Sequence, residues 1–257
     1  MLTPPEIVRS LLAAGESKAR LPFGKMLLLA ILAGAYIALA GVGATAAAVT
    51  VESGSLAKLL SACVFPAGLS MVILAGSELF TGNCLMVMAL LERRITPAQL
   101  LRNWLTVYLG NAVGGAAVAA LAVYSHTASL FGDGLARSMV SIAESKAALG
   151  FGDAFLRGVL CNFLVCLAVW MAAASKRAEG KVIALFFPIL LFVLCGYEHC
   201  IANLYYLPAG AFAAAEYGME TTLTLAGCLE NLAAVTLGNL VGGAALGVGY
   251  RFAYLKE

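Results

Sequence analysis

The sequence predicts an all-α membrane protein whose six transmembrane helices form two inverted three-helix repeats, with the second and fifth helices interrupted by loops. Three observations support this fold class. The chain has 257 residues, of which 62% are hydrophobic and 12% are charged, whereas soluble domains average roughly 45–50% apolar and about 25% charged residues. Six apolar segments are long enough to cross a bilayer, and motifs of the first half recur in the second half.

The N-terminal residues 1–24 are predicted to form an amphipathic helix at the membrane surface, because charged and apolar side chains alternate there at helical spacing after Pro4 and Pro5. The next apolar segment, 25–50, is longer than the roughly 7–15 residues of a signal-peptide core, so we interpret it as the first span. The other spans are predicted at 58–91, 98–125, 154–175, 182–208 and 222–254. They form one transmembrane channel domain, 1–257, with a first repeat at 25–125 and a second at 150–255.

Two spans contain glycine and polar residues in mid-stretch. The second carries Pro66 and then Gly-Ser-Glu-Leu-Phe-Thr-Gly-Asn at 76–83, and the fifth carries Pro188 and then Gly-Tyr-Glu-His-Cys-Ile-Ala-Asn at 196–203. Irregular backbone at membrane depth survives only where protein or a water-filled cavity satisfies its polar groups. Both stretches are therefore predicted to be loops that break their helices beside such a cavity.

The two predicted breaks match each other at an offset of 120 residues, with glycine, glutamate and asparagine in equivalent places. A longer match pairs 103–118 with 231–246 at an offset of 128, and ten of its sixteen positions are identical. The eight-residue difference predicts a longer loop around 207–221 in the second half. Because each repeat has three spans, the second copy is upside down in the bilayer, an architecture typical of transporters and channels.

The basic residues predict the orientation in the membrane. With the N-terminus inside, twelve of the sixteen lysines and arginines lie on the inner side, Lys256 among them, and four lie on the outer side, which follows the positive-inside rule. We therefore expect a multi-pass protein of the cell's inner membrane with both termini cytoplasmic. The four outer residues are Lys58, Arg137, Lys146 and Arg157.

Several kinds of partner are excluded by composition. The net charge of +2 and the lack of a basic stripe with interleaved aromatic residues argue against nucleic acid. The seven cysteines form no CxxC pair and no cluster with histidine at metal-binding spacing. We therefore expect no metal and no cofactor.

Three ionisable side chains lie well inside apolar segments: Glu78, Glu198 and His199. Each costs on the order of 2.5–3.5 kcal/mol at the bilayer centre, so each needs a partner or a function. We interpret the glutamates as loop-stabilising residues that accept from the free N–H groups of the following half-helix; direct involvement in conduction is the alternative. His199 can change its charge near neutral pH, and with the Thr81 hydroxyl in the other break it is predicted to form a site near the midplane.

Four motifs, in order and on the expected spans, resemble the formate/nitrite transporter family over about residues 5 to 254: GSELFTGN, LCNFLVCLAVWMA, GYEHCIANLYYLPAG and VTLGNLVGG. The resemblance implies a homopentamer with one pore per protomer and a pore centre at His199 and Thr81. It further implies polar pore residues at Asn162 and Asn239 and a vestibule lysine at Lys146, and it gives no role to Asn111, the repeat mate of Asn239. The apolar constrictions it implies are Phe65, Leu69, Leu79, Phe80, Val165 and Phe192.

The expected function is passage of a small monovalent anion. Lys146 and neighbouring charges would draw the anion into a vestibule, an apolar constriction would remove its water at a cost, and His199 with Thr81 would bind it and could protonate it. Formate is the first choice of substrate, and nitrite or hydrosulfide is the alternative within the family. The sequence does not decide between a passive channel and proton-coupled transport.

Two other classes fit less well. A neutral-solute channel would share this aquaporin-like architecture of inverted halves, but its paired Asn-Pro-Ala motifs are absent from the sequence. An intramembrane enzyme would need a nucleophile or a metal set. Glu198, His199 and Cys200 are adjacent in the chain and so rarely converge on one substrate atom, and neither Gly-x-Ser-x-Gly nor His-Glu-x-x-His occurs. We therefore expect no enzyme.

Overall fold

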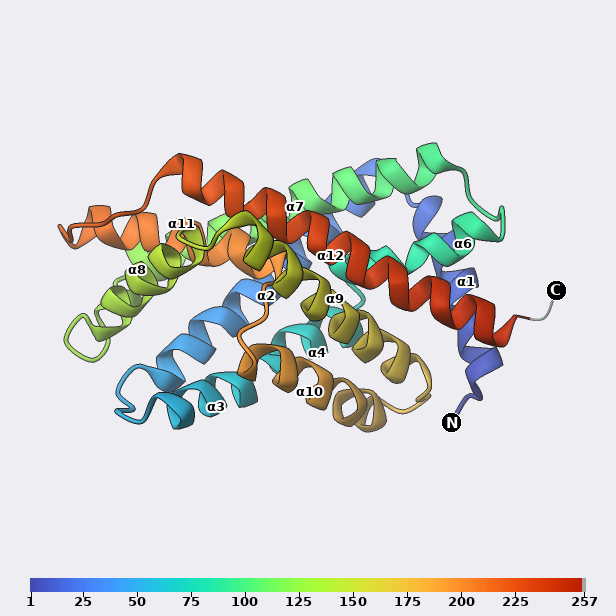
Figure 1. The fold of residues 1–257 in the computed structure, drawn as a ribbon, viewed down its shortest axis with the longest axis horizontal. Helices are drawn as coiled ribbons and strands as arrows, with labels where there is room; N and C mark the ends of the chain where they lie inside the picture. The colour runs from blue at the N-terminus through green and yellow to red at the C-terminus, as the bar shows by residue number, and fades with distance from the viewer. Residues whose placement is uncertain (256–257) are drawn as a thin grey trace.

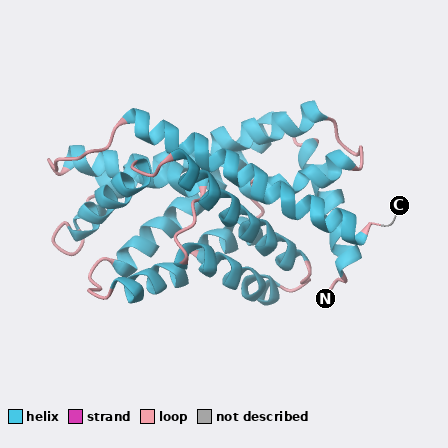
Figure 2. Cartoon of the chain, in the orientation of Figure 1, coloured by secondary structure: helices cyan, strands magenta, loops and turns pink. Residues whose placement is uncertain are grey.

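The computed structural model of the protein describes residues 1–255, which fold into helices joined by short connections, with no strand in that part of the chain (Figure 2). Lys256, assigned to the inner side above, lies outside the described residues. The α-helices are α1 (Pro4–Ala19), α2 (Phe23–Ala48), α3 (Gly54–Val64), α4 (Pro66–Ala75), α5 (Phe80–Asn83), α6 (Val87–Leu91), α7 (Pro97–Tyr124), α8 (Gly134–Ala147), α9 (Phe151–Ala173), α10 (Ala178–Leu194), α11 (Cys200–Glu216) and α12 (Leu225–Tyr254). Two 3-10 turns complete them, η1 (Cys84–Met86) and η2 (Thr127–Ser129).

Within residues 1–255, five continuous helical stretches are long and apolar enough to cross a membrane. The predicted fifth span is not continuous, because it is divided between α10 and α11, which have 17 residues each. The second span is also divided, and only its first part, Gly54–Ala75, reaches spanning length. The five stretches are Phe23–Ala48, Gly54–Ala75, Pro97–Tyr124, Phe151–Ala173 and Leu225–Tyr254.

Helix α1 is amphipathic, as the charge pattern predicted. Its first turn is closed by the Thr3 N–H, which donates to Glu6 Oε2 over 2.7 Å. Its apolar side chains Ile7, Val8 and Leu12 are buried against η1, α6 and α12. The buried face of α1 therefore covers one end of the helix bundle (Figure 1).

Both predicted breaks exist, but each ends four residues earlier than expected. The first break begins at Gly76, directly after α4, and the chain becomes helical again at Phe80. The φ angle of Gly76 is 79°, in the left-handed region that glycine tolerates. The second leaves α10 through Gly196, with φ of 69°, and helix resumes at Cys200. The second half of each predicted loop is thus the first turn of a half-helix. Side chains from α7 and α12, described below, accept the first N–H of each half-helix.

One helix was not predicted at all. Helix α8 occupies residues between the two repeats that we treated as a connection. Its apolar side chains Leu135, Met139 and Ala143 are buried against α11. Lys146 near its C-terminal end corresponds to Lys18 near the end of α1 at an offset of 128. Helix α8 is therefore the counterpart of α1, and each repeat has one helix more than predicted.

The eight-residue difference between the repeat offsets is only partly explained by a longer loop in the second half. Helix α11 has 17 residues, against twelve in Phe80–Leu91, and the connection 217–224 has eight, against five in 92–96. The prediction of a longer loop around 207–221 was therefore wrong for most of that range, because α11 continues to Glu216. The extra length is largely helix.

The long helices pack in two tight pairs, α2 with α7 and α9 with α12. A Cβ atom placed on Gly114 of α7 would lie 2.0 Å from the Ile31 carbonyl oxygen of α2, and one on Gly242 of α12 would lie 2.0 Å from the Val159 carbonyl oxygen of α9. Only glycine allows backbones to approach so closely. Figure 1 shows α12 running alongside α9 through the centre of the molecule.

Candidate functional site

The two helix breaks meet at Thr81 and His199. The Thr81 hydroxyl oxygen and His199 Nε2 are 3.0 Å apart, and both residues are buried, with 0% and 3% of their surfaces exposed. His199 caps α11, because its Nδ1 accepts from the Ala202 N–H over 3.0 Å. Since Nδ1 is an acceptor, the imidazole is neutral with its proton on Nε2. Nε2–H therefore donates to the Thr81 oxygen, which leaves the Thr81 hydroxyl proton without a partner in this contact. Unlike His199, Thr81 is not on the wall of either cavity described below.

The first break is held in place by Asn111 of α7. Its Oδ1 accepts from the Phe80 N–H, the first of α5, over 3.0 Å. Its Nδ2 donates to the carbonyl oxygens of Ala30 (2.7 Å) and Glu78 (2.9 Å). One buried amide thus satisfies two backbone groups that the helix break would leave without partners, and anchors the break to the Ala30 carbonyl oxygen of α2.

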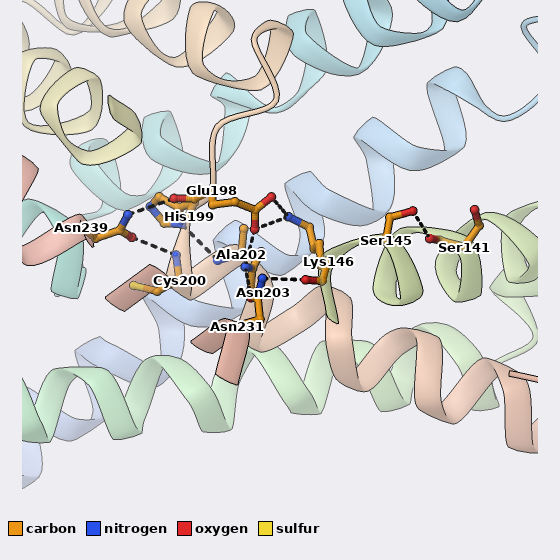
Figure 3. Close-up of polar contacts among 10 residues, drawn as sticks. All are labelled: Ser141, Ser145, Lys146, Glu198, His199, Cys200, Ala202, Asn203, Asn231 and Asn239. Carbon is orange, nitrogen blue, oxygen red and sulfur yellow. Dashed lines mark hydrogen bonds and ion pairs between the residues drawn. The ribbon is translucent and has the colours of Figure 1, made fainter. Parts of the chain in front are cut away.

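The second break is held in the same way by Asn239 of α12. Its Oδ1 accepts from the Cys200 N–H over 2.9 Å, and its Nδ2 donates to the carbonyl oxygens of Gly158 (2.8 Å) and Glu198 (2.9 Å). Figure 3 shows its contacts with Cys200 and Glu198. The two asparagines that the repeat aligned are therefore the equivalent clamps of the two breaks.

Asn162 and Asn239 had been predicted as polar pore residues, but neither is on the wall of the two cavities described below. Asn162 Nδ2 donates to the carbonyl oxygens of Thr81 (3.2 Å) and Asn239 (2.7 Å). Both asparagines are fully buried, and all their amide donors are used by backbone. In this structure they support the site from behind rather than face a pore.

The glutamates of the breaks were predicted to accept from the free N–H groups of the half-helices. That prediction is wrong. Glu198 accepts from Lys146 Nζ at 2.9 and 3.0 Å and from Asn203 Nδ2 at 2.7 Å. Asn203 also donates to Asn231 Oδ1, and Asn231 donates to the Lys146 carbonyl oxygen (Figure 3). The first N–H of each half-helix, that of Phe80 or Cys200, donates to an asparagine clamp, and each glutamate binds a lysine and an asparagine instead.

The first repeat contains the same arrangement. Glu78 accepts from Lys18 Nζ over 2.6 Å and from Asn83 Nδ2 over 2.8 Å, and Asn83 also donates to Asn103 Oδ1 over 2.9 Å. Lys18 comes from α1, just as Lys146 comes from α8. Each glutamate therefore ties its break to one amphipathic helix.

A large cavity leads from the surface to His199. Its volume is about 860 Å³, and we call it the vestibule. Its wall includes Lys146, Tyr206 and, at the deep end, Phe65, Phe192 and His199. Lys146 Nζ also lies 5.4 Å from the centre of the Tyr206 ring, which favours a cation.

Beyond the vestibule the passage is closed by apolar side chains. The rings of Phe65 and Phe192 meet edge to face at 5.7 Å. Both residues also line a void of about 10 Å³ that touches His199, which is no larger than a single water-sized probe. The remaining wall of this void is made of Ile37, Leu69, Leu79, Val165 and Ile189.

The predicted constriction residues thus divide into two groups. Phe65, Leu69, Leu79, Val165 and Phe192 are on the wall of the small void, whereas Phe80 is not. The Phe80 ring packs instead against Tyr108 at 5.1 Å and Trp104 at 6.4 Å. Ile37 and Ile189 were missed, because one more isoleucine in an apolar span carries no signal of its own.

No group of three or more His, Cys, Asp or Glu side chains within residues 1–255 could hold a metal ion. The polar groups at the centre are a neutral imidazole, a hydroxyl and backbone. Such a set can bind a small anion through hydrogen bonds.

Comparisons with known proteins identify the family. The chain matches the formate/nitrite transporter family profile over residues 5–253. A protein of Methanothermobacter thermautotrophicus named a probable formate transporter is 38% identical over 99% of this chain and 98% of its own length. A solved structure described as an FNT family ion channel has a TM-score of 0.86 at 32% identity, covering 96% of this chain and 98% of that one. Another, a pentameric formate channel with formate bound, has a TM-score of 0.80 at 33% identity, covering 91% and 98%. The chain belongs to the formate/nitrite transporter family.

Proposed function

We propose that this protein conducts formate across the cell's inner membrane, as a homopentamer with one pore in each protomer. The observation that carries the proposal is the contact between Thr81 and His199 at the inner end of the vestibule, directly behind Phe65 and Phe192. The names of the relatives support formate as the substrate. They do not favour nitrite.

The vestibule first collects the anion. Lys146 lies on its wall and is held there by Glu198, and further basic side chains surround it. Because a cavity with low-dielectric walls focuses the field of its charges, the local concentration of a small anion rises there. Entry of an anion into the vestibule therefore depends mainly on its negative charge.

The aromatic pair then selects for size and charge. To pass between Phe65 and Phe192 an anion must lose most of its water, and an unpaired ion in an apolar passage is strongly disfavoured. His199 lies immediately behind on the wall of both cavities, and the Thr81 hydroxyl bound to it would offer a hydrogen bond that compensates part of this cost once a substrate reaches it. A small planar anion with three non-hydrogen atoms, such as formate, fits this sequence of steps.

His199 controls the protonation of the site. A second proton on its imidazole must go to Nδ1, which now accepts from the Ala202 N–H. Protonation therefore requires the first turn of α11 to release its cap. Proton-coupled passage, in which the substrate leaves as the neutral acid, would use that rearranged state, whereas passage of the anion itself would use the state described here.

The proposed orientation places α1 and both termini in the cytoplasm, with the vestibule outside. It is supported by the twelve basic residues on the inner side against four on the other. Transport, rather than catalysis, is the proposed activity of the whole chain.

The deciding experiment is flux of formate, nitrite and hydrosulfide, measured side by side in proteoliposomes across a range of pH. We expect formate to move fastest and its rate to depend on pH. Protein-free liposomes correct for diffusion of the neutral acids. Equal rates with and without protein for all three anions would contradict the proposal, and a preference for nitrite would contradict the choice of substrate.

A further inference from the structure

The vestibule wall carries three basic residues besides Lys146. They are Lys58, Arg137 and Arg157. All three are exposed, and none forms an ion pair within residues 1–255. Lys146 is neutralised by Glu198, which is the only acidic residue on this wall. The vestibule therefore has an excess of three positive charges.

Some basic residues near the opposite end of the molecule are compensated by a contact. Lys18, Arg94 and Arg251 each contact a glutamate, at 2.6, 2.9 and 2.7 Å. Arg102 donates to the backbone carbonyl oxygen of Leu21. Arg137 in the vestibule likewise donates to a backbone carbonyl oxygen, that of Gly132, and among the described residues Lys25 and Lys176 also form no ion pair. What distinguishes the vestibule is that three cations without a carboxylate partner share the wall of one cavity, although formate or any other single-charged anion needs only one cation to balance it.

Hydroxyl groups accompany these charges. Ser138, Ser141 and Ser145 lie on one face of α8 and line the vestibule. Figure 3 shows Ser141 and Ser145 along α8, beyond Lys146 and farther from Glu198. Guanidinium, ammonium and hydroxyl groups together are the donors that recognise oxyanions with several oxygen atoms. The cavity of about 860 Å³ has room for anions much larger than formate.

We propose that the vestibule binds multivalent oxyanions, such as sulfate, phosphate or oxalate, and that the bound anion blocks entry of the monovalent substrate. The blocking step rests on the proposed function, whereas the binding step does not. A divalent anion is attracted twice as strongly as a monovalent one by the same charges. It cannot pass Phe65 and Phe192, because its desolvation cost is higher and one proton would still leave it charged. It therefore stays in the vestibule.

Binding is tested on the purified protein in detergent, by thermal unfolding in sodium sulfate and in sodium chloride of equal ionic strength. We expect sulfate to raise the melting temperature more than chloride does. The double variant Lys58→Gln/Arg157→Gln should need at least tenfold more sulfate for the same shift. Two matched variants should respond like the wild type. One is the charge-conserving Lys58→Arg/Arg157→Lys, and the other is Lys25→Gln/Lys176→Gln, which removes one charge in the first turn of α2 and one just after the end of α9.

Block is tested by formate current across a planar bilayer, with sulfate added first on one side and then on the other. We expect inhibition from one side only, and about tenfold more sulfate should be needed in Lys58→Gln/Arg157→Gln, relative to that variant's own uninhibited current. Equal sulfate stabilisation in all four proteins, or none in the wild type, would overturn the binding site. Formate current without one-sided block would overturn the block, and so would formate uptake into proteoliposomes, where passage carries no current, if sulfate did not inhibit it. Absence of both current and uptake would contradict only the proposed function.

Discussion

Replacing Asn111 by alanine removes the clamp of the first break without touching the passage. The change leaves the Phe80 N–H and the Glu78 carbonyl oxygen without a partner and removes a second hydrogen bond from the Ala30 carbonyl oxygen, which remains bonded within α2. Hydrogen bonds between membrane helices average about 0.6 kcal/mol each, which gives about 2 kcal/mol for three. Buried groups left unsatisfied cost about 1–3 kcal/mol each when they cannot find water, so we expect a loss of about 2–5 kcal/mol.

The repeat provides a matched second measurement. Asn239 makes the same three kinds of hydrogen bond at nearly the same distances, so Asn239→Ala should destabilise the protein by a similar amount. Leu109→Ala on α7 is the control, because 62% of the Leu109 surface is exposed and its loss should cost little. A shift of 1 kcal/mol corresponds to roughly 2–4 °C for a domain of this size, so both asparagine variants should melt about 4–20 °C below the wild type.

The assay is thermal unfolding in detergent, followed by formate flux in proteoliposomes for whichever variants fold. Flux should fall together with stability, because a break that is not clamped cannot hold the Thr81 hydroxyl oxygen 3.0 Å from His199 Nε2. If Asn111→Ala melted like Leu109→Ala, or if only one of the two asparagines mattered, the idea of two equivalent clamps would be refuted.

Four further predictions concern the passage and the connection 217–224. His199→Phe should abolish the pH dependence of formate flux in an intact pentamer, and an unchanged pH profile would exclude that role. Thr81→Val should lower formate flux at least tenfold, whereas Thr81→Ser, which keeps the hydroxyl, should retain most of it. Phe192→Ala should widen the constriction, so larger monocarboxylates such as acetate should cross faster than in the wild type, as measured by liposome flux. The Thr222 N–H holds the pKa of the exposed Glu144 carboxyl below its ordinary value. That contact is therefore present above about pH 4 and lost as pH falls through the lowered pKa. Limited proteolysis of this connection should accelerate only in acid in the wild type, and already at neutral pH in Glu144→Ala, which has no side-chain acceptor.

The fold could largely be predicted from the sequence, because apolar length and the repeat are both local signals. Helix α8 was missed for a physical reason. Its apolar face, with Leu135 and Met139, packs on protein rather than on lipid, so the segment is too short and too polar to be identified as a span. The equivalence of α8 and α1 becomes clear in the structure, where Lys18 forms an ion pair with Glu78 and Lys146 forms one with Glu198.

The site was predicted in part. Thr81 and His199 stand out in sequence because polar residues are rare at membrane depth, and the structure brings them together. Asn111 was given no role, since its partners are backbone groups of α2 and of the break, and backbone contacts leave no trace in residue identity. The repeat itself was the available signal, because it aligned Asn111 with Asn239.

The glycine contacts between α2 and α7, and between α9 and α12, limit how the protein can move. At Gly114 and Gly242 the facing backbones leave no space for even one added carbon atom. Sliding or rotation of one helix against the other in either pair would bring the two main chains into steric clash. Each pair is therefore expected to move as one rigid unit. Opening and closing of the passage is therefore expected to come from the shorter helices and from a change in the tilt between the two rigid pairs. Gly76 and Gly196, which have positive φ angles, are the expected hinge residues.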